Sequence, residues 1–337
     1  MAARVCLIVN PAAGGGKAGR LAPDVQLRLG ELGLAVRRAD TSDLEDARRL
    51  ALEAVRAGET AVALSGDGMV GAIADALRSE PGAVLGVLPG GRGNDLARVL
   101  GIPRDALEAC AVIASGKPRA VDLGEVLATG SEPPRAYVGI ASVGFDSDAN
   151  RIANEAPSWL GGLVYVYGAL RALASWKPAR FQIELDPPGE RHSFSGYTVG
   201  IANSKAYGGG MYAAPDAQLD DGLLEVVVKE HVGKLRFISE LPKVFKGAHV
   251  RLASVRSFRA AEVEVSADRP FTMYADGDPI GTLPLRLRAI RGAVTMLVPE
   301  QPAVGSAFSK PSATATASDA AERDSAAASK SGASAEA

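Results

Sequence analysis

Short apolar runs that alternate with helical spacing dominate the first 126 residues of the chain. Residues 5–9, 61–64 and 84–88 are apolar, and each run stops at a glycine-rich turn before a helical pattern begins. This is the order expected of a strand, a tight turn and a helix. Three such units predict a doubly wound α/β domain. The same patterns predict further helices near 19–32, 44–55 and 105–115, and further strands at 34–38 and 120–123.

The helix expected at 44–55 carries signals at both of its ends. Ser42 and Glu45 have the spacing of a capping box, which predicts Ser42 as the N-cap and Glu45 reaching back to it. Gly58 follows the last apolar position of the pattern and is expected to end the helix.

The second half of the chain has a different pattern, in which short strands predominate. A stretch rich in Gly, Ser and Pro at 125–135 marks the change, and many short strands between turn residues favour a sandwich or barrel. Helical spacing interrupts the strands at 159–176 and 234–245. The expected strands are 136–143, 180–185, 195–203, 223–228, 251–258, 262–266, 272–275, 284–289 and 293–298.

These patterns divide the chain into an α/β domain at 1–126, a β-rich sandwich domain at 127–299 and a tail at 300–337. The tail consists mainly of Ala, Ser, Thr, Lys and Glu, which cannot bury enough apolar surface to order themselves. We therefore expect a disordered tail, in which only Phe308 is able to dock locally.

Composition narrows the classes of protein that the chain can represent. The net charge is −2, so nothing draws the whole molecule to nucleic acid. Cys6 and Cys110 both lie in apolar runs, which predicts buried thiols rather than a disulfide or a metal site. The sequence shows no signal peptide and no apolar run of about 18 residues. We expect a cytoplasmic protein.

The three glycine-rich turns suggest a phosphorylated ligand. Glycine lets a backbone approach a ligand closely, and the helix after each turn aims its first N–H groups at an anion. In an open α/β sheet the three turns would share the carboxyl edge, where ligands bind. A nucleotide is the ligand that we expect. Asp67 in the central turn would accept a hydrogen bond, bridge to a metal or simply cap the helix.

Two nucleotide-binding motifs compete with this interpretation. Gly14, Gly16 and Gly19 have the spacing of the dinucleotide-binding fingerprint, and Asp40 ends the next strand about 20 residues later. That fingerprint leaves the other two glycine turns unexplained. A P-loop is excluded, because Lys17 is followed by Ala18 and Pro11 stands where the first glycine belongs.

Two acidic motifs lie in the second half of the chain. Asp220 and Asp221 precede Gly222, and two adjacent carboxylates could hold a hard cation together with backbone carbonyls. Taken alone, these residues are better explained by a hairpin with Asp-Gly at its turn. Asp276 and Asp278 flank Gly277, which again indicates a turn, and these carboxylates could supply a general base and a metal contact.

Together these motifs resemble the diacylglycerol kinase-like lipid kinases, which include soluble bacterial diacylglycerol kinases and sphingosine kinases. The resemblance covers roughly residues 5–298 and implies a nucleotide domain similar to phosphofructokinases and NAD kinases, a β-rich domain, and ATP in the cleft between them. It is carried, in family order, by SGDG at 65–68, PGGRGND at 89–95, ANSKAYGGGMYAAPDAQLDDGLLEVV at 202–227 and DGD at 276–278.

The resemblance also implies roles for individual residues. Asp278 stands where the family has its general base, and Asp67 would bridge the nucleotide and acceptor through a catalytic magnesium ion. A structural magnesium ion would be held by Asp221 and by the carbonyls of Gln218 and Leu223. The implied cofactors are therefore ATP and Mg²⁺. The implied nucleotide contacts are Asn10, Pro11, Ala12, Ala13, Gly14, Thr41, Gly66, Asp67, Gly68, Met69, Gly71, Arg92, Asn94 and Asp95.

The chain departs from the family pattern at several positions. The usual Gly-Gly-Asp-Gly-Thr begins with Ser65 and ends with Met69, and Gly71-Ala72 replaces the usual Asn-Glu. Arg92 replaces a threonine, and Asp278 replaces the usual glutamate. We expect phosphorylation of a membrane lipid, with diacylglycerol favoured. Another glycerolipid, a sphingoid base, an NAD kinase-like reaction and an inactive nucleotide- or lipid-binding scaffold stay open.

Basic residues suggest contact with a membrane surface. Between Lys229 and Arg259 there are eight Lys or Arg and two acidic residues. We expect this segment to help a peripheral enzyme dock on anionic bilayers, with scattered solvated charges as the alternative. A homodimer is left open.

Overall fold

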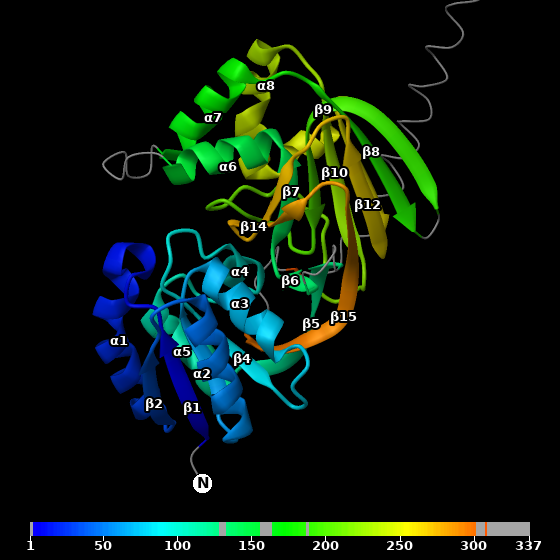
Figure 1. Cartoon of the computed structure of the whole chain (residues 1–337). Helices are drawn as coiled ribbons and strands as arrows, with labels where there is room; N and C mark the ends of the chain where they lie inside the picture. The colour runs from blue at the N-terminus through cyan, green and yellow to red at the C-terminus, as the bar shows by residue number, and fades with distance from the viewer. Residues whose placement is uncertain (1–2, 128–132, 156–163, 187–188, 301–306, 309–337) are drawn as a thin grey trace, which may run out of the picture.

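The computed structural model describes residues 3–127, 133–155, 164–186, 189–300 and 307–308. An N-terminal α/β unit and a C-terminal β-rich unit lie one above the other (Figure 1). Among the described residues, fifteen strands join into one hydrogen-bonded sheet that runs through both units. Its main path is β14-β13-β7-β9-β8-β12-β15-β4-β3-β1-β2.

The N-terminal unit is the doubly wound domain that the sequence predicts. Its four neighbouring strands are parallel, in the order β4-β3-β1-β2. Helix α1 packs with α5 and α2 packs with α3, so that the two pairs cover opposite faces of the sheet (Figure 1). The elements are β1 (Arg4–Val9), α1 (Ala13–Glu31), β2 (Ala35–Asp40), α2 (Leu44–Arg56), β3 (Thr60–Ser65), α3 (Asp67–Leu77), β4 (Val84–Pro89), α4 (Asp95–Val99) and α5 (Ala106–Ser115).

Two long strands connect the units. In β15 (Leu285–Val298) the first half pairs with β12 (Glu262–Ala267) of the C-terminal unit, and the second half pairs in parallel with β4. Strand β5 (Lys117–Val126) runs antiparallel along most of β15, with an irregularity between Ile290 and Val294. The two strands predicted at 284–289 and 293–298 are therefore one strand. The division of the chain at residue 126 stays a prediction, because β15 pairs with both units.

The C-terminal unit is β-rich, as predicted, with a helical cap. Its sheet encloses a core rich in aromatic and branched side chains, among them Phe181, Tyr197 and Val263. The remaining elements are β6 (Arg135–Tyr137), β7 (Ile140–Gly144), α6 (Phe145–Glu155), α7 (Val164–Ser175), β8 (Ala179–Asp186), β9 (Glu190–Ala202), β10 (Leu224–Glu230), α8 (Lys234–Glu240), the 3₁₀ helices η2 (Leu241–Lys246) and η3 (Ala248–Arg251), β11 (Val255–Ala260), β13 (Thr272–Ala275) and β14 (Asp278–Thr282).

Several local expectations need correction. The N-cap of α2 is Asp43, not Ser42: its carboxylate accepts from the Asp46 N–H (2.8 Å), while Asp46 accepts from the Ser42 N–H (3.1 Å). The N-cap thus lies one residue later than predicted, and the returning hydrogen bond reaches the residue before the N-cap. Residues 248–251 are a 3₁₀ helix, so the strand expected at 251–258 begins only at Val255.

Other expectations are confirmed or only partly described. Cys6 and Cys110 are buried free thiols, and burial raises the pKa of both, that of Cys110 to about 11. The helix expected at 159–176 corresponds to α7, although residues 159–163 lie outside the described residues. Most of the predicted tail lies outside them as well. Within it, the Ala307 N–H binds the Val99 carbonyl (2.7 Å), and the Arg119 guanidinium stacks on the Phe308 ring.

Candidate active site

The three glycine-rich turns lie side by side at the carboxyl edge of β1, β3 and β4. The Asn10 N–H donates to the Leu64 carbonyl (3.3 Å), and the Gly90 N–H donates to the Ser65 carbonyl (2.9 Å). The backbones approach so closely that a Cβ at Gly14 would lie 2.5 Å from the Gly90 carbonyl oxygen. A Cβ at Gly91 would likewise lie 2.4 Å from the Gly66 Cα. Glycine is therefore required where the turns meet.

These turns line an open cleft of about 380 Å³. Helix α3 begins there at Asp67, so its first N–H groups face the cleft, and Arg92 adds a positive charge. Both features favour a polyanionic ligand such as a polyphosphate. The lining residues are Asn10, Ala12, Ala13, Gly14, Gly15, Ser65, Gly66, Asp67, Gly68, Met69, Gly91 and Arg92.

Asp67 joins the central turn to the third turn. Its two carboxylate oxygens accept hydrogen bonds from the N–H groups of Asp95 and Leu96, both at 3.0 Å. Asp95 is buried, and its carboxylate accepts from the Gly209 N–H (2.7 Å) and pairs with Arg98 (3.1 Å). Burial raises the pKa of Asp95, and the nearby charge of Asp67 raises it further. Asp67 thus caps α4, instead of α3 as its position in the sequence suggests.

The turn at 276–278 brings two carboxylates from the C-terminal unit to the same edge. Asp276 has a φ of 51° and accepts hydrogen bonds from the N–H groups of Val138 (2.8 Å) and Gly139 (2.9 Å). Burial raises the pKa of Asp276 to about 6, and the charges of Asp67 and Asp278 add to this rise.

Asp278 lies beside the start of α3. A Cβ added to Gly68 would be 4.0 Å from the Asp278 Oδ2 atom, and both residues line a second, smaller cavity that adjoins the first cleft at Gly68. No described residue hydrogen-bonds to the Asp278 carboxylate or forms an ion pair with it. Arg48, Arg135 and Asp276 also line this cavity.

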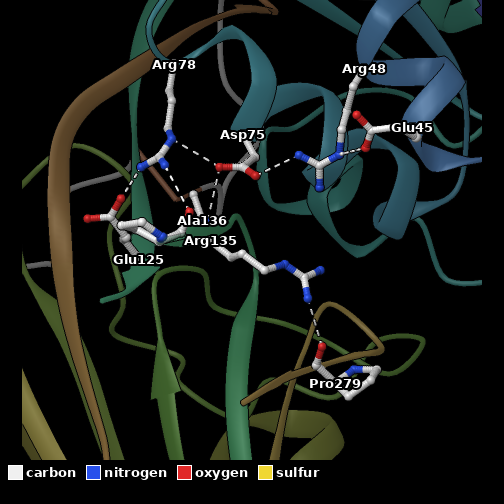
Figure 2. Close-up of polar contacts among 9 residues, drawn as sticks. Glu45, Arg48, Asp75, Arg78, Glu125, Arg135, Ala136 and Pro279 are labelled. Atoms are coloured by element: carbon white, nitrogen blue, oxygen red, sulfur yellow. Dashed lines mark hydrogen bonds and ion pairs between the residues drawn. The ribbon is translucent and has the colours of Figure 1, made fainter. Parts of the chain in front are cut away.

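A polar network holds the turn against α3 (Figure 2). Asp75, on α3, pairs with Arg48 (2.8 Å) and Arg78 (3.1 Å), and it accepts from the Ala136 N–H (3.1 Å). The preceding residue, Arg135, donates to the carbonyl of Pro279 (3.0 Å). Glu125 of β5 extends the network by pairing with Arg78 and with Arg288 (2.7 Å). This network was missed in the sequence, where its one signal is the carboxylate of Asp75 within an apolar helical pattern.

Comparison with known proteins decides the family. Residues 4–126 match the diacylglycerol kinase catalytic domain, and residues 139–298 match the YegS C-terminal NAD kinase beta sandwich-like domain. Over 301 residues the chain is 33% identical to a diacylglycerol kinase of Mycobacterium tuberculosis (strain CDC 1551 / Oshkosh), covering 88% of the chain and 95% of that protein. The chain belongs to the diacylglycerol kinase-like lipid kinases.

Further similarities agree with this family. A Stenotrophomonas maltophilia (strain K279a) protein named "Probable lipid kinase YegS-like" is 32% identical over 266 residues, which cover 75% of the chain and 84% of that protein. The crystal structure of a diacylglycerol kinase from Bacillus anthracis str. Sterne shares the fold, with a TM-score of 0.68 and 20% identity over 89% of the chain and 98% of that chain. Membership of the lipid kinase family, shown by the matches over residues 4–126 and 139–298, argues against the dinucleotide-binding interpretation of Gly14, Gly16 and Gly19.

In this lipid kinase, backbone geometry explains why glycines stand at the positions of the dinucleotide-binding fingerprint. Gly14, Gly15 and Gly16 all have positive φ values, between 61° and 84°, and a Cβ at Gly19 would lie 2.9 Å from the Pro11 carbonyl oxygen. Asp40, the acidic residue that completes the fingerprint spacing, pairs with Arg38 at 2.8 Å. Tight turns therefore account for the glycine spacing.

Some predicted nucleotide contacts shape the turns of the lipid kinase rather than line the open cleft. The Thr41 hydroxyl donates to the Asp43 carbonyl (2.6 Å). The Asn94 side chain brackets Gly91, accepting from its N–H (2.8 Å) and donating to its carbonyl (3.0 Å). Pro11 packs against Gly19, and Gly71 lines the smaller cavity. Direct contact of these residues with a nucleotide stays a prediction.

The predicted structural magnesium site offers no free anionic ligand. One oxygen of Asp221 accepts from the Leu223 N–H (3.0 Å), and the other pairs with Arg259. The described residues contain no group of three His, Cys, Asp or Glu side chains placed to hold a metal. The Arg259 guanidinium occupies the side of Asp221 where a cation would bind, so this arrangement does not fit a bound magnesium ion. The site expected at Gln218, Asp221 and Leu223 stays a prediction.

A buried carboxylate that sequence reasoning missed organises this segment. Asp122 of β5 accepts from the N–H groups of Gly222 (2.6 Å) and Gly292 (2.7 Å), and burial raises its pKa. Its signal in the sequence is a lone carboxylate inside an apolar strand pattern, where burial requires hydrogen-bond partners. Asp122 thereby ties the segment at 219–222 to the connecting strands.

Proposed function

We propose that this lipid kinase transfers the γ-phosphate of ATP to a hydroxyl of a membrane lipid, with diacylglycerol as acceptor and phosphatidic acid as product. The observation that carries the proposal is the position of Asp278. This unpaired carboxylate comes from the β-rich unit and stands beside the anion-favouring turn of the α/β unit. The names of the Mycobacterium and Stenotrophomonas relatives support the class of substrate.

The first part of the proposed mechanism is the binding of the polyphosphate. Phosphoryl transfer depends on positioning and on neutralising charge that spreads over the phosphate oxygens. The N–H groups at the start of α3, the adjoining glycine turns and Arg92 face the cleft in which the phosphates would lie. Asp67 also lines the cleft and would face a nucleotide-borne Mg²⁺, which supplies further charge neutralisation when bound.

The second part is removal of a proton from the acceptor. As the lipid oxygen bonds to the γ-phosphorus and the bond to ADP breaks, the hydroxyl proton moves to the Asp278 carboxylate. Asp276 is less suited to this role, because both of its oxygens already accept backbone N–H groups. Asp276 therefore shapes the turn, and Asp278 acts as the general base.

Substitution of Asp278 tests the proposal. Asp278→Asn should lower single-turnover phosphoryl transfer to diacylglycerol at least about 100-fold, the loss expected for a general base. Nucleotide affinity, measured separately, should stay near that of the wild type. Asp278→Glu restores the usual family residue and should retain substantial activity.

Asp276→Asn is the matched control, since it changes a neighbouring carboxylate of the same turn. We expect it to reduce stability more than turnover. An Asp278→Asn enzyme within about threefold of wild type would remove this carboxylate from the mechanism, since general bases contribute far more.

The identity of the acceptor needs its own experiment. Incubation with labelled ATP, Mg²⁺ and mixed total lipid should yield labelled phosphatidic acid as the main product. A labelled sphingoid phosphate would keep the kinase class and change the acceptor. The absence of any labelled lipid would favour an inactive binding scaffold.

A further inference from the structure

The segment formed by α8 and η2, residues 234–246, has a buried inner side. Phe237 is buried and lies against Tyr197 and Phe145, with ring centroids 4.1 and 4.9 Å apart. Glu240 is also buried, and Lys229 (2.5 Å) and Arg236 (2.8 Å) neutralise its charge. On the inner side, Phe237 is therefore packed among aromatic rings and the charge of Glu240 is paired. These contacts fix the segment with its outer side toward solvent.

The outer side is unusually apolar for a solvent-facing surface. Leu235 is 86% exposed, Phe245 55% and Ile238 41%. Single exposed leucines are common, but a cluster of exposed large apolar side chains indicates an interaction surface. Three of the eight exposed large hydrophobic residues within the described part of the chain lie in this one segment.

The charges of the outer side have one sign. Lys234, Lys243 and Lys246 are exposed, and none of them forms an ion pair with a described residue. The only acidic residue of the segment is Glu240, which faces inward. The wider basic stretch at 229–259 presents less unpaired positive charge than its sequence suggests, because Lys229, Arg256 and Arg259 pair with acidic residues.

We propose that the outer side of residues 234–246, here called the α8–η2 face, docks this enzyme on an anionic bilayer. Leu235, Ile238 and Phe245 would enter the boundary between headgroups and acyl chains, while the three lysines contact lipid phosphates. Exposed apolar residues interleaved with cations are typical of interfacial membrane binding. The inference rests on the proposed function, since a lipid acceptor has to be reached in the membrane.

A short path connects the α8–η2 face to the active site. The Val244 carbonyl of η2 accepts a hydrogen bond from the Tyr212 N–H (3.0 Å). The loop that leads to Tyr212 includes Gly209, whose N–H holds the Asp95 carboxylate beside Asp67. The α8–η2 face is thus linked to a loop that contacts Asp95, and the N–H of Asp95 binds the Asp67 carboxylate.

Co-sedimentation of the full chain with vesicles tests the docking face. The wild type should bind vesicles of phosphatidylcholine with phosphatidylglycerol, and added salt should weaken the binding. We expect Leu235→Glu with Phe245→Glu, and separately Lys243→Glu with Lys246→Glu, to weaken it at least about tenfold. Leu27→Glu is the matched control, because Leu27 is 66% exposed on α1, outside this face.

The outcomes separate docking from catalysis. With a short-chain diacylglycerol dispersed without vesicles, the face variants should keep wild-type turnover, whereas turnover on vesicle-borne diacylglycerol should fall. Vesicle binding that neither salt nor either double variant alters would overturn the docking proposal, even if lipid phosphorylation is intact.

Loss of self-association in the variants, with vesicle binding unchanged, would assign the face to a second copy of the chain instead. A wild type that binds vesicles through this face but phosphorylates no lipid would refute only the proposed reaction.

Discussion

At the scale of the residue, two glycines leave the space that the Asp276 carboxylate occupies. A Cβ at Gly71 would lie 2.9 Å from one Asp276 oxygen, and a Cβ at Gly139 would lie 2.4 Å from the other. Gly71 is one of the positions at which the chain departs from the family pattern that its motifs resemble. In this chain the position serves the turn that carries Asp278, so the departure has a structural reason.

The raised pKa of Asp276 predicts that the stability of the protein depends on pH. Its pKa of about 6 lies above the ordinary value of 3.8, so the folded state holds a proton that the unfolded state has released. Between about pH 4 and pH 6 the free energy of unfolding should fall as pH rises, by up to about 3 kcal/mol for this group. Chemical denaturation across that range measures the change.

Asp276→Asn provides the comparison for this prediction. The variant has no titrating group at the position, so its stability should change less over the same interval, although it starts lower because an amide cannot accept both N–H groups. Parallel pH profiles for wild type and variant would show that another group is responsible.

The residues of the site could be predicted only in part. Asp67, Asp276 and Asp278 lie in short glycine turns that are visible in the sequence. Their partners could not be predicted, because the Asp67 carboxylate binds N–H groups of Asp95 and Leu96, and Asp276 binds those of Val138 and Gly139. These contacts depend on how distant loops meet.

At the scale of the element, α3 and β6 together hold the turn at 276–278. Asp75 fastens the α3 helix to the Ala136 N–H, and Arg135 reaches from the same strand to the Pro279 carbonyl (Figure 2). The N–H groups of Val138 and Gly139, just beyond β6, hold Asp276. The segment at 135–139 therefore contacts the residues on both sides of Gly277.

Arg135→Ala should separate positioning from stability. Loss of one exposed hydrogen bond costs only about 1 kcal/mol, so the melting temperature should change little. Turnover should fall about tenfold, because small displacements of a reacting group are costly, while the Kd for ATP stays near wild type. Arg28→Ala, at an arginine with a surface ion pair on α1, is the control. Equal effects of both substitutions on turnover would exclude a positioning role for Arg135.

Elements with strong local patterns were predictable, and those that depend on tertiary contacts were not. The three strand–turn–helix units follow directly from apolar spacing and glycine. Helix α6 was not expected, since its sequence, FDSDANRIANE, is rich in residues that favour turns. Strand β14 begins within the DGD motif and was obscured by its turn signal.

At the scale of the whole molecule, the described chain ends against the α/β unit. Ala307 is buried and donates to the Val99 carbonyl, and Phe308 lies beneath Arg119. No helix in the described part of the chain has the length and hydropathy needed to cross a membrane. The described contacts of the tail are thus with the protein itself.

Two truncations test the contribution of the tail. Deleting residues 310–337 should leave the melting temperature and turnover unchanged, because these residues lack the apolar content to build a core. Deleting 305–337 also removes Ala307 and Phe308, and should lower the melting temperature by about 2–4 °C. A large loss of stability from the shorter deletion would contradict the compositional argument.

Strand β15 has a consequence for the order of events during synthesis. Leu85 of β4 pairs with Met296, and nearly all of β5 takes its partners from β15. When the ribosome has released the first 126 residues, the edge of β4 and most of β5 therefore still lack their neighbours. The α/β unit is translated first but its sheet closes last, so a nascent fragment exposes unpaired strand edges that promote aggregation.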